Sequence, residues 1–328
     1  MIRAMLSTTP IPGLTTAPTA LVFGTGSLGS AIPADDAFRL MDRYAELGGN
    51  HFDSAHVYAA WLPRGTGASE RTVGAWVRRR GMEGRVCVAT KGAHFNLDGV
   101  HASRVRPECI AADLRESLDR LGLARVDLYY LHRDDPSVPV EPLLEALERE
   151  RRAGLIGAYA ASNWSAPRMA EARTIARARG WSGFVANQIE WSLAEVPPTE
   201  SCGLGTRAAD TTLRAWHREN GVPIAAYSSQ ALGFFQRTWS WPLPSGDLGK
   251  FARFANEANV QRWRRVADRA AARGNSRNQL VLACLLNQPQ PVWPVLGCRT
   301  LAQVNDSMGS AAVRLTASEI ADLQAGRR

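Results

Sequence analysis

Four side chains that could carry out acid–base chemistry follow three apolar stretches of the sequence. Asp53 and Tyr58 stand in "GNHFDSAHVY", Lys91 in "VATKG" and His132 in "DLYYLH". A phenol has a reference pKa of about 10, and a neighbouring cation lowers that pKa because it stabilises the phenolate. We expect Lys91 to lower the pKa of Tyr58, Asp53 to keep Lys91 charged, and His132 to hydrogen-bond the substrate oxygen. Together they predict a general-acid centre that reduces a carbonyl with hydride from a nicotinamide.

Each of these residues has an ordinary structural explanation when it is taken alone. A tyrosine near the end of a strand usually packs, and a single histidine usually fills a place in the core or on the surface. Asp53 and Lys91 are harder to explain in that way, because both end apolar strands, where a buried charge has to be paired. The sequence therefore predicts an ion pair between these two residues.

The elements that would position these residues alternate between strands and helices along the chain. The apolar runs predicted as strands are residues 20–24, 49–55, 86–92, 126–132, 156–162, 183–189, 222–228 and 291–297. The runs predicted as helices are residues 34–48, 69–80, 107–121, 140–153, 165–179, 206–220, 256–287 and 300–309. Eight such repeats predict a (β/α)8 TIM barrel, one domain over residues 1–328, whose βα loops meet at one rim.

The longest irregular stretch, residues 229–257, follows the seventh predicted strand. It is rich in glycine, proline and aromatic residues. A loop of that length usually serves as a lid or a binding loop, so we expect it to contact a ligand.

Six motifs make the chain resemble a known family. "GNHFDSAHVY", "VATKG", "DLYYLH", "ASNW", "NQIEWSL" and "PVLGCRT" stand in the order, and near the spacing, of the aldo-keto reductase superfamily, over residues 18–310. The resemblance implies a (β/α)8 barrel, NADPH as the cofactor, and Asp53, Tyr58, Lys91 and His132 as the catalytic tetrad. The "LHRDDP" run and the long loop look like a branch of bacterial members with broad or unassigned substrates.

The resemblance also implies a cofactor site. Its residues are Ser162, Asn163 and Gln188 for the nicotinamide carboxamide, Tyr227 for stacking on the ring, Ser228, Ser229 and Gln230 for the pyrophosphate, and Gly297, Arg299, Thr300, Gln303 and Asp306 for the adenosine end. An arginine at position 299 suits a 2′-phosphate, because its fork of donors matches a dianion. Ser307 stands where the family often has Asn, which weakens the expected adenine contact and leaves NADPH favoured over NADH.

The glycines of "LVFGTGSLGS" offer a different interpretation. Gly24, Gly26 and Gly29 have the G-x-G-x-x-G spacing of a Rossmann dinucleotide-binding unit, which would use Asp53 as a ribose ligand. That fold does not explain the other three tetrad residues or eight strands. In a barrel, Gly24, Thr25 and Gly26 form a tight βα turn near the cofactor, where the absence of a Cβ permits close approach.

Two further residues are predicted to face the substrate. Trp61 follows Tyr58 by three residues, and His94 follows Lys91 by the same distance. Trp191, Trp239 and Trp241 are candidates that could equally be packing residues.

Two other kinds of site are not expected. His51, Asp53 and His56 could suggest metal ligands, but no fourth ligand is evident and Lys91 would repel a cation. The "HRDD" run at 132–135 resembles a kinase catalytic loop, yet Pro139 stands where that loop has Asn.

Bulk properties set the remaining expectations. The net charge of +8 comes almost entirely from dispersed arginines, with lysine only at positions 91 and 250, so we expect no nucleic-acid partner. Five scattered cysteines without a C-x-x-C motif predict reduced thiols in the cytoplasm. We find no signal peptide and no apolar run long enough to span a membrane. The sequence predicts no oligomeric state.

The main functional hypothesis is therefore an NADPH-dependent reductase of an aldehyde or ketone, acting without a metal, with Tyr58 as general acid. A second is oxidation or reduction of a sugar or of a natural-product secondary alcohol, which needs the same residues. A third is a regulatory subunit that binds NADP without catalysis, although such a protein would not need to keep all four tetrad residues.

Overall fold

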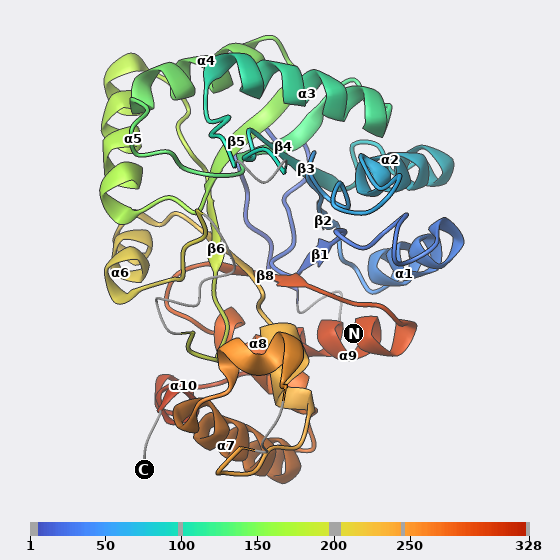
Figure 1. Ribbon diagram of the computed structural model, residues 1–328, viewed down its shortest axis with the longest axis vertical. Coiled ribbons are helices and arrows are strands. Elements are labelled where there is room, and N and C mark those ends of the chain that lie inside the picture. Colours follow the sequence, from blue (N-terminus) through green and yellow to red (C-terminus); the bar gives the residue numbers. More distant parts are fainter. Residues whose placement is uncertain (1–5, 98–100, 197–204, 244–246, 326–328) are drawn as a thin grey trace.

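Eight parallel strands close into a barrel in the order β1 to β8 (Figure 1). The computed structural model describes residues 6–97, 101–196, 205–243 and 247–325. The first strand pairs with β2 on one side and with β8 on the other, which completes the ring. The predicted (β/α)8 barrel is confirmed.

The strands occupy the predicted runs but are mostly shorter. They are β1 Val22–Gly24, β2 His51–Asp53, β3 Cys87–Gly92, β4 Val126–Leu131, β5 Ile156–Ser162, β6 Asn187–Glu190, β7 Ile224–Tyr227 and β8 Val292–Leu296. Residues beyond the strand ends are buried as well, as Ser54 and Ala55 are after β2. The backbone N–H of Ser54 still donates to the oxygen of Ala89 at 2.8 Å, so the pairing with β3 continues past Asp53.

The helices surround the barrel. They are α1 Ala34–Glu46, α2 Ala68–Arg80, α3 Pro107–Leu121, α4 Val140–Arg152, α5 Ala166–Arg179, α6 Thr211–Asn220, α7 Glu257–Arg273, α8 Arg277–Leu286, α9 Leu301–Gly309 and α10 Ala317–Gln324. The single helix predicted over residues 256–287 was wrong. Gly274, with φ of 67°, ends α7, and Ser276 starts α8 with a capping box to Gln279.

The inner face of the barrel leads to the catalytic rim. Alternate residues of a strand point to the same side, so Cys87, Ala89 and Lys91 of β3 face inward, and the first two belong to a buried cluster with Tyr130 and Trp293. A short N-terminal hairpin, with Thr8 bridged to Thr19, packs Ile11 against the same cluster. The polar side chains gather at the opposite ends of the strands.

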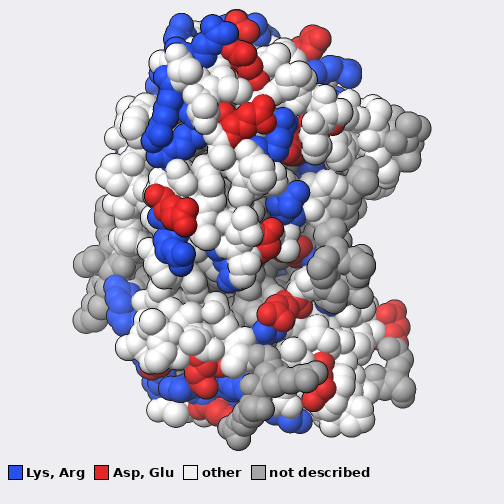
Figure 2. Space-filling view, turned by 90° about the vertical axis from the view of Figure 1, so that its left-hand side faces the viewer, with Lys and Arg blue, Asp and Glu red and all other residues white. Residues whose placement is uncertain are grey.

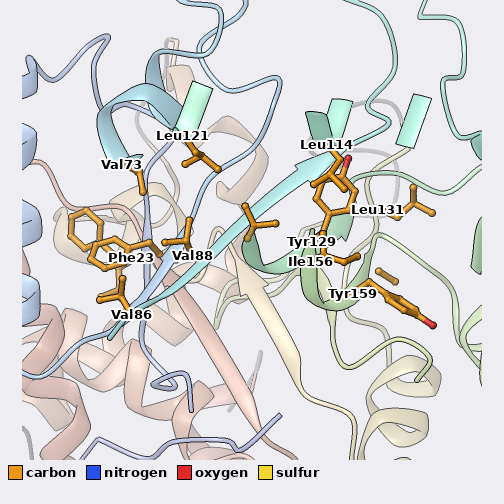
Figure 3. Packing of buried hydrophobic residues seen from close by; sticks show 14 of the residues in the cluster. Phe23, Val73, Val86, Val88, Leu114, Leu121, Tyr129, Leu131, Ile156 and Tyr159 are labelled. Atoms are coloured by element: carbon orange, nitrogen blue, oxygen red, sulfur yellow. The ribbon is translucent and has the colours of Figure 1, made fainter. Parts of the chain in front are cut away.

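The outer face of the barrel packs against the helices. Figure 3 shows Val73 of α2 and Leu121 of α3 lying toward Phe23 and Val88 of the strands, and all four are buried in one cluster. This packing fixes the strands, and with them the direction of the loops that leave their carboxyl ends.

The loop of residues 229–257 is compact in its described part. It contains two 3₁₀ helices, η3 Ala231–Gln236 and η4 Gly249–Phe254, while residues 244–246 lie outside the described residues. Trp239 joins them, because its ring stacks on Phe234 at 4.7 Å between centroids and meets Phe251 edge-on at 5.7 Å. These aromatics share a buried cluster with α7, α8 and α10, which lie together beside the barrel (Figure 1).

Charged side chains on the outer surface are intermixed. Figure 2 shows basic and acidic groups interspersed on one face of the molecule. Many arginines pair with acids of the same helix, as Arg151 does with Glu148 at 2.7 Å. Within the described residues, no helix combines the length and the apolar character needed to cross a membrane.

Candidate active site

Asp53, Tyr58 and Lys91 contact one another directly at the carboxyl ends of β2 and β3. The Nζ of Lys91 donates to Oδ2 of Asp53 and to the phenol oxygen of Tyr58, at 2.8 Å in each case. The phenol in turn donates to the same Oδ2 of Asp53 at 3.2 Å. The predicted ion pair is confirmed, and the phenol lies against both of its members.

The ammonium is held from several sides. Lys91 and Asp53 are almost fully buried, and Nζ also donates to the backbone oxygen of Ser54 at 2.8 Å. The other carboxylate oxygen of Asp53 accepts a hydrogen bond from Nε2 of Gln188 at 2.9 Å. A buried pair with these additional partners satisfies the condition under which charges can stay in a protein interior.

The pKa of Tyr58 differs from the sequence-based expectation. Burial, followed by the negative charge of Asp53, raises the pKa of this phenol well above 10, and Arg133 only partly opposes the shift. Burial lowers the pKa of Lys91, against the opposing effect of Asp53. The expected acidification was wrong for the chain without ligands, because Asp53 is hydrogen-bonded to the phenol and burial disfavours a phenolate. The phenol is therefore protonated at neutral pH.

His132 is the first residue after β4, and its ring meets the ring of Tyr58 edge-on at 6.1 Å between centroids. Its backbone N–H donates to the oxygen of Gly92 at 2.9 Å, which fixes the loop beside β3. Burial and the charge of Arg133 lower the pKa of His132 well below its usual value. The Nδ1 atom is buried and has no hydrogen-bond partner among the described residues. A neutral imidazole thus stands next to the phenol.

The residues predicted to hold the nicotinamide form a hydrogen-bonded chain around this centre. The Ser162 hydroxyl donates to the backbone oxygen of Gln188 at 2.9 Å. Asn163 has a left-handed backbone with φ of 65°, and its Nδ2 donates to the Ser162 hydroxyl at 3.0 Å and to the His132 oxygen at 3.3 Å. The hydroxyl of Tyr227 donates to Oδ1 of Asn163 at 2.9 Å. The structure therefore brings these residues together with the tetrad.

A cavity of about 560 Å³ continues from this centre between the ends of β1, β7 and β8. It begins at Gly26, where an added Cβ would lie 3.7 Å from the ring of Tyr58. The predicted cofactor residues that line it are Gly24, Gly26, Ser228, Ser229, Gln230, Gly297, Arg299, Gln303 and Asp306. The cavity thus runs from Gly26, which lies beside the Tyr58 ring, to the predicted adenosine end.

Other predicted cofactor residues support the walls of this cavity. Thr25 is fully buried, and its hydroxyl donates to the backbone oxygen of Asp53 at 2.9 Å. Thr300 caps α9 by accepting from the backbone N–H of Gln303. An added Cβ on Gly24 would lie 2.7 Å from the backbone oxygen of Leu296, so the seam between β1 and β8 requires glycine there.

The cavity also has lining residues that the sequence did not reveal. Arg237 and Lys250 come from the loop of residues 229–257, and Asn278 comes from α8. The rarity of lysine in this chain was the available signal for Lys250, which is one of only two. Asn278 donates to Asp306 at 2.9 Å and to Ser307 at 3.0 Å, so the Ser307 hydroxyl is used inside the wall.

The candidate pocket residues have different positions. The ring of His94 lies against His132 at 4.7 Å between centroids. Trp61 is 60% exposed and Trp241 is 41% exposed, whereas Trp239 and Trp191 are buried in hydrophobic clusters.

The described residues contain no group of three or more potential metal ligands. The histidines considered for a metal have other partners, since His56 contacts Glu116 at 2.9 Å and His51 contacts the backbone oxygen of Thr19 at 3.3 Å. Four cysteines are buried free thiols, at positions 87, 109, 284 and 298, and Cys202 lies outside the described residues.

Comparison with known proteins agrees with this geometry. The sequence profile of the aldo/keto reductase family matches residues 20–327. The chain belongs to this family, and so is an oxidoreductase of carbonyl and alcohol groups. It is 29% identical over 288 residues to "Aldo-keto reductase yakc (NADP+)" of Schizosaccharomyces pombe, covering 85% of this chain and 79% of that protein. Its fold is similar to the crystal structure of a thermostable aldo-keto reductase, Tm1743, in complex with the inhibitor epalrestat, with a TM-score of 0.71 and 19% identity over 97% of this chain and 99% of the other.

Proposed function

We propose that the protein is an NADPH-dependent reductase of an aldehyde or ketone, with Tyr58 as the general acid. The observation that carries the proposal is the triangle of Asp53, Tyr58 and Lys91, with Gly26 of the cavity lining beside the Tyr58 ring. The name of the Schizosaccharomyces pombe relative, which includes NADP(+), supports the same cofactor. When bound, NADPH supplies the hydride that reaches the carbonyl carbon.

The cavity suits a phosphorylated dinucleotide. Three cations line it, namely Arg237, Lys250 and Arg299, and Ser228 and Gln230 add polar groups to the same lining. A cavity of about 560 Å³ also lies within the usual range for cofactor sites. We assign the 2′-phosphate to Arg299, because a guanidinium offers paired donors to a dianion. The carboxamide would be held by Ser162, Asn163 and Gln188, with Tyr227 against the ring.

The residues of the chain would act on the substrate oxygen. Tyr58, protonated at neutral pH, donates its proton to that oxygen as the carbonyl is reduced. Lys91 stabilises the phenolate that results, and Asp53 holds the ammonium in place. His132 is neutral and donates a hydrogen bond to the same oxygen, which polarises the carbonyl before the proton moves.

The proposal is tested by mixing the purified protein with NADPH and a panel of aldehydes and ketones. We expect oxidation of NADPH with at least part of the panel, and a lower KM for NADPH than for NADH. Cofactor binding, followed separately by NADPH fluorescence, distinguishes the alternatives. Binding without turnover of any carbonyl would contradict the reductase assignment and favour the regulatory subunit.

The free cysteines are consistent with a reducing compartment, and we propose the cytoplasm. The partner we propose is a small carbonyl or alcohol, and the catalytic residues serve both directions of its reaction.

A further inference from the structure

His94 has a fixed tautomer. Its Nδ1 lies 2.8 Å from the backbone oxygen of Phe95, and because a carbonyl only accepts, this nitrogen carries the ring proton. Burial, followed by the charge of Arg133, lowers the pKa of His94 to about 4, so the ring is neutral at physiological pH. Its other nitrogen, Nε2, is then a hydrogen-bond acceptor with no proton of its own.

The acceptor nitrogen belongs to a ring that lies beside His132. Nε2 of His94 makes no hydrogen bond with any described residue, and it is not among the buried atoms that lack a partner. The His94 ring meets the ring of His132 at 4.7 Å between centroids and 68° between planes. The two imidazoles therefore stand side by side, so a ligand that contacts His132 also lies close to the ring of His94.

The backbone before His94 is held in an uncommon conformation. Ala93 has φ of 56°, in the left-handed region that residues with a Cβ seldom adopt. The backbone N–H of Ala93 donates to Oδ2 of buried Asp113 at 2.8 Å, and the guanidinium of Arg104 donates to both oxygens of that carboxylate. Arg104 also reaches the backbone oxygen of His94 at 3.5 Å. Strain of this kind persists where the surrounding structure fixes it, and it occurs often at functional sites.

We propose that His94 selects carbonyl substrates with a hydroxyl group on the carbon next to the carbonyl. The inference rests on the proposed function, in which Tyr58 and His132 contact the carbonyl oxygen. His132 donates to that oxygen, and His94 accepts from the neighbouring hydroxyl. The substrate class is therefore a hydroxyaldehyde or hydroxyketone, a group that includes small sugars.

The same geometry disfavours a second carbonyl or a carboxylate in that place. An oxygen without a proton would face the Nε2 lone pair of His94, with no hydrogen bond between them. We therefore expect 1,2-diketones and 2-oxo acids to be poorer substrates than the matching hydroxyketones.

The test compares substrates that differ only at this group. We expect hydroxyacetone to have kcat/KM about fivefold higher than 2-butanone, which carries a methyl in place of the hydroxyl, because one neutral hydrogen bond contributes about 1 kcal/mol. Glycolaldehyde and propionaldehyde form a second pair. Binding of 1,2-propanediol and of 2-butanol to the NADP+ complex gives the same comparison without turnover.

His94→Phe keeps a planar ring but removes the acceptor. We expect the ratio of kcat/KM for hydroxyacetone to that for 2-butanone to fall to about one, whatever happens to the value for 2-butanone alone. His94→Gln, whose amide oxygen can accept, should recover part of the preference.

The outcomes separate the two proposals. Equal kcat/KM for hydroxyacetone and 2-butanone in the unmodified protein would overturn the role of His94 and leave the reductase assignment standing. A preference that survives His94→Phe would also overturn it. Failure to reduce any carbonyl, with NADPH bound, would contradict the proposed function itself and the inference with it.

Discussion

The ammonium of Lys91 lies 2.8 Å from the phenol oxygen of Tyr58 and 4.4 Å from the centroid of its ring. The same charge thus contacts the phenol at its oxygen and along its ring. Without ligands the phenol keeps its proton and donates a hydrogen bond to Asp53, so Lys91 has no phenolate to stabilise. In the proposed reaction, the ammonium stabilises Tyr58 most once the phenol has given its proton to the substrate.

Removing the phenol should therefore remove most of the catalysis. For Tyr58→Phe we expect kcat for carbonyl reduction to fall by about 10²–10⁴, the usual contribution of a positioned general acid. NADPH binding should change little, because the phenol oxygen contacts Asp53 and Lys91. Steady-state kinetics and fluorescence titration measure the two quantities, and an unchanged kcat would refute the acid role.

The pair of Lys91 and Asp53 should be linked in stability. Lys91→Met leaves a buried carboxylate without its cation, which costs about 3–5 kcal/mol. The double variant Asp53→Asn with Lys91→Met removes both charges and should recover much of the free energy of unfolding, but no activity. Denaturant unfolding of the single and double variants gives the coupling. If the double variant is no more stable than Lys91→Met, the two charges are not coupled as the distance of 2.8 Å implies.

The pH dependence should differ between the two reaction directions. The raised pKa of Tyr58 keeps the phenol protonated below about pH 10. The lowered pKa of His132 keeps the imidazole neutral at any pH above the ordinary pKa of histidine. We expect kcat/KM for reduction to be flat across the neutral range. Oxidation of the alcohol needs the phenolate, so its rate should rise with pH. A reduction rate that falls from pH 7 to 9 would show that the phenol titrates lower.

An ion pair holds the second 3₁₀ helix of the loop of residues 229–257 to the barrel. One nitrogen of Arg253 lies 2.6 Å from each carboxylate oxygen of Glu190, which ends β6 and is nearly buried. The same helix carries Lys250 and Phe251 to the cavity. We expect Arg253→Met to raise the Kd for NADPH by about tenfold, since these two residues lose their anchor.

The control for this prediction is Arg179→Met. Arg179 pairs with Glu141 on the exposed side of α5, so its loss should not change the Kd. Fluorescence titration of both variants decides the matter. Equal affinities would mean that the Glu190–Arg253 pair does not hold the binding surface.

Arg299 should decide the preference between cofactors. We expect Arg299→Ala to weaken NADPH binding about 10–100-fold, because a charge-assisted contact with the 2′-phosphate is lost. NADH lacks that phosphate, so its affinity serves as the internal control. An equal loss of affinity for both cofactors would assign Arg299 to a part of the nucleotide that they share.

Three of the site residues that were predicted from the sequence share one property. Asp53, Lys91 and His132 each end a continuous apolar run, and in a parallel barrel such positions come to one rim. Arg237 and Lys250 stand in a segment without periodicity, whose path depends on packing around Trp239. No local pattern could place them beside the cavity.

The direction in which the pKa of Tyr58 is shifted could not be predicted from the sequence either. The expected sign followed from Lys91 alone, whereas burial and then the charge of Asp53 raise the pKa of the phenol. Only distances can rank these effects. By contrast, the break between α7 and α8 had a local signal that was missed, because Gly274 is a helix C-cap residue and Ser276 with Gln279 forms a capping box.

The seam at Gly24 has a consequence for how the protein becomes able to bind a nucleotide. One wall of the cavity is made near the start of the chain, by Gly24 and Gly26, and the other near its finish, by Gly297 and Arg299. A nascent polypeptide that has not yet added β8 therefore lacks one of these two walls of the nucleotide cavity. Occupancy of the cavity thus reports that the ring is complete, and any nucleotide held there stabilises the finished state by mass action.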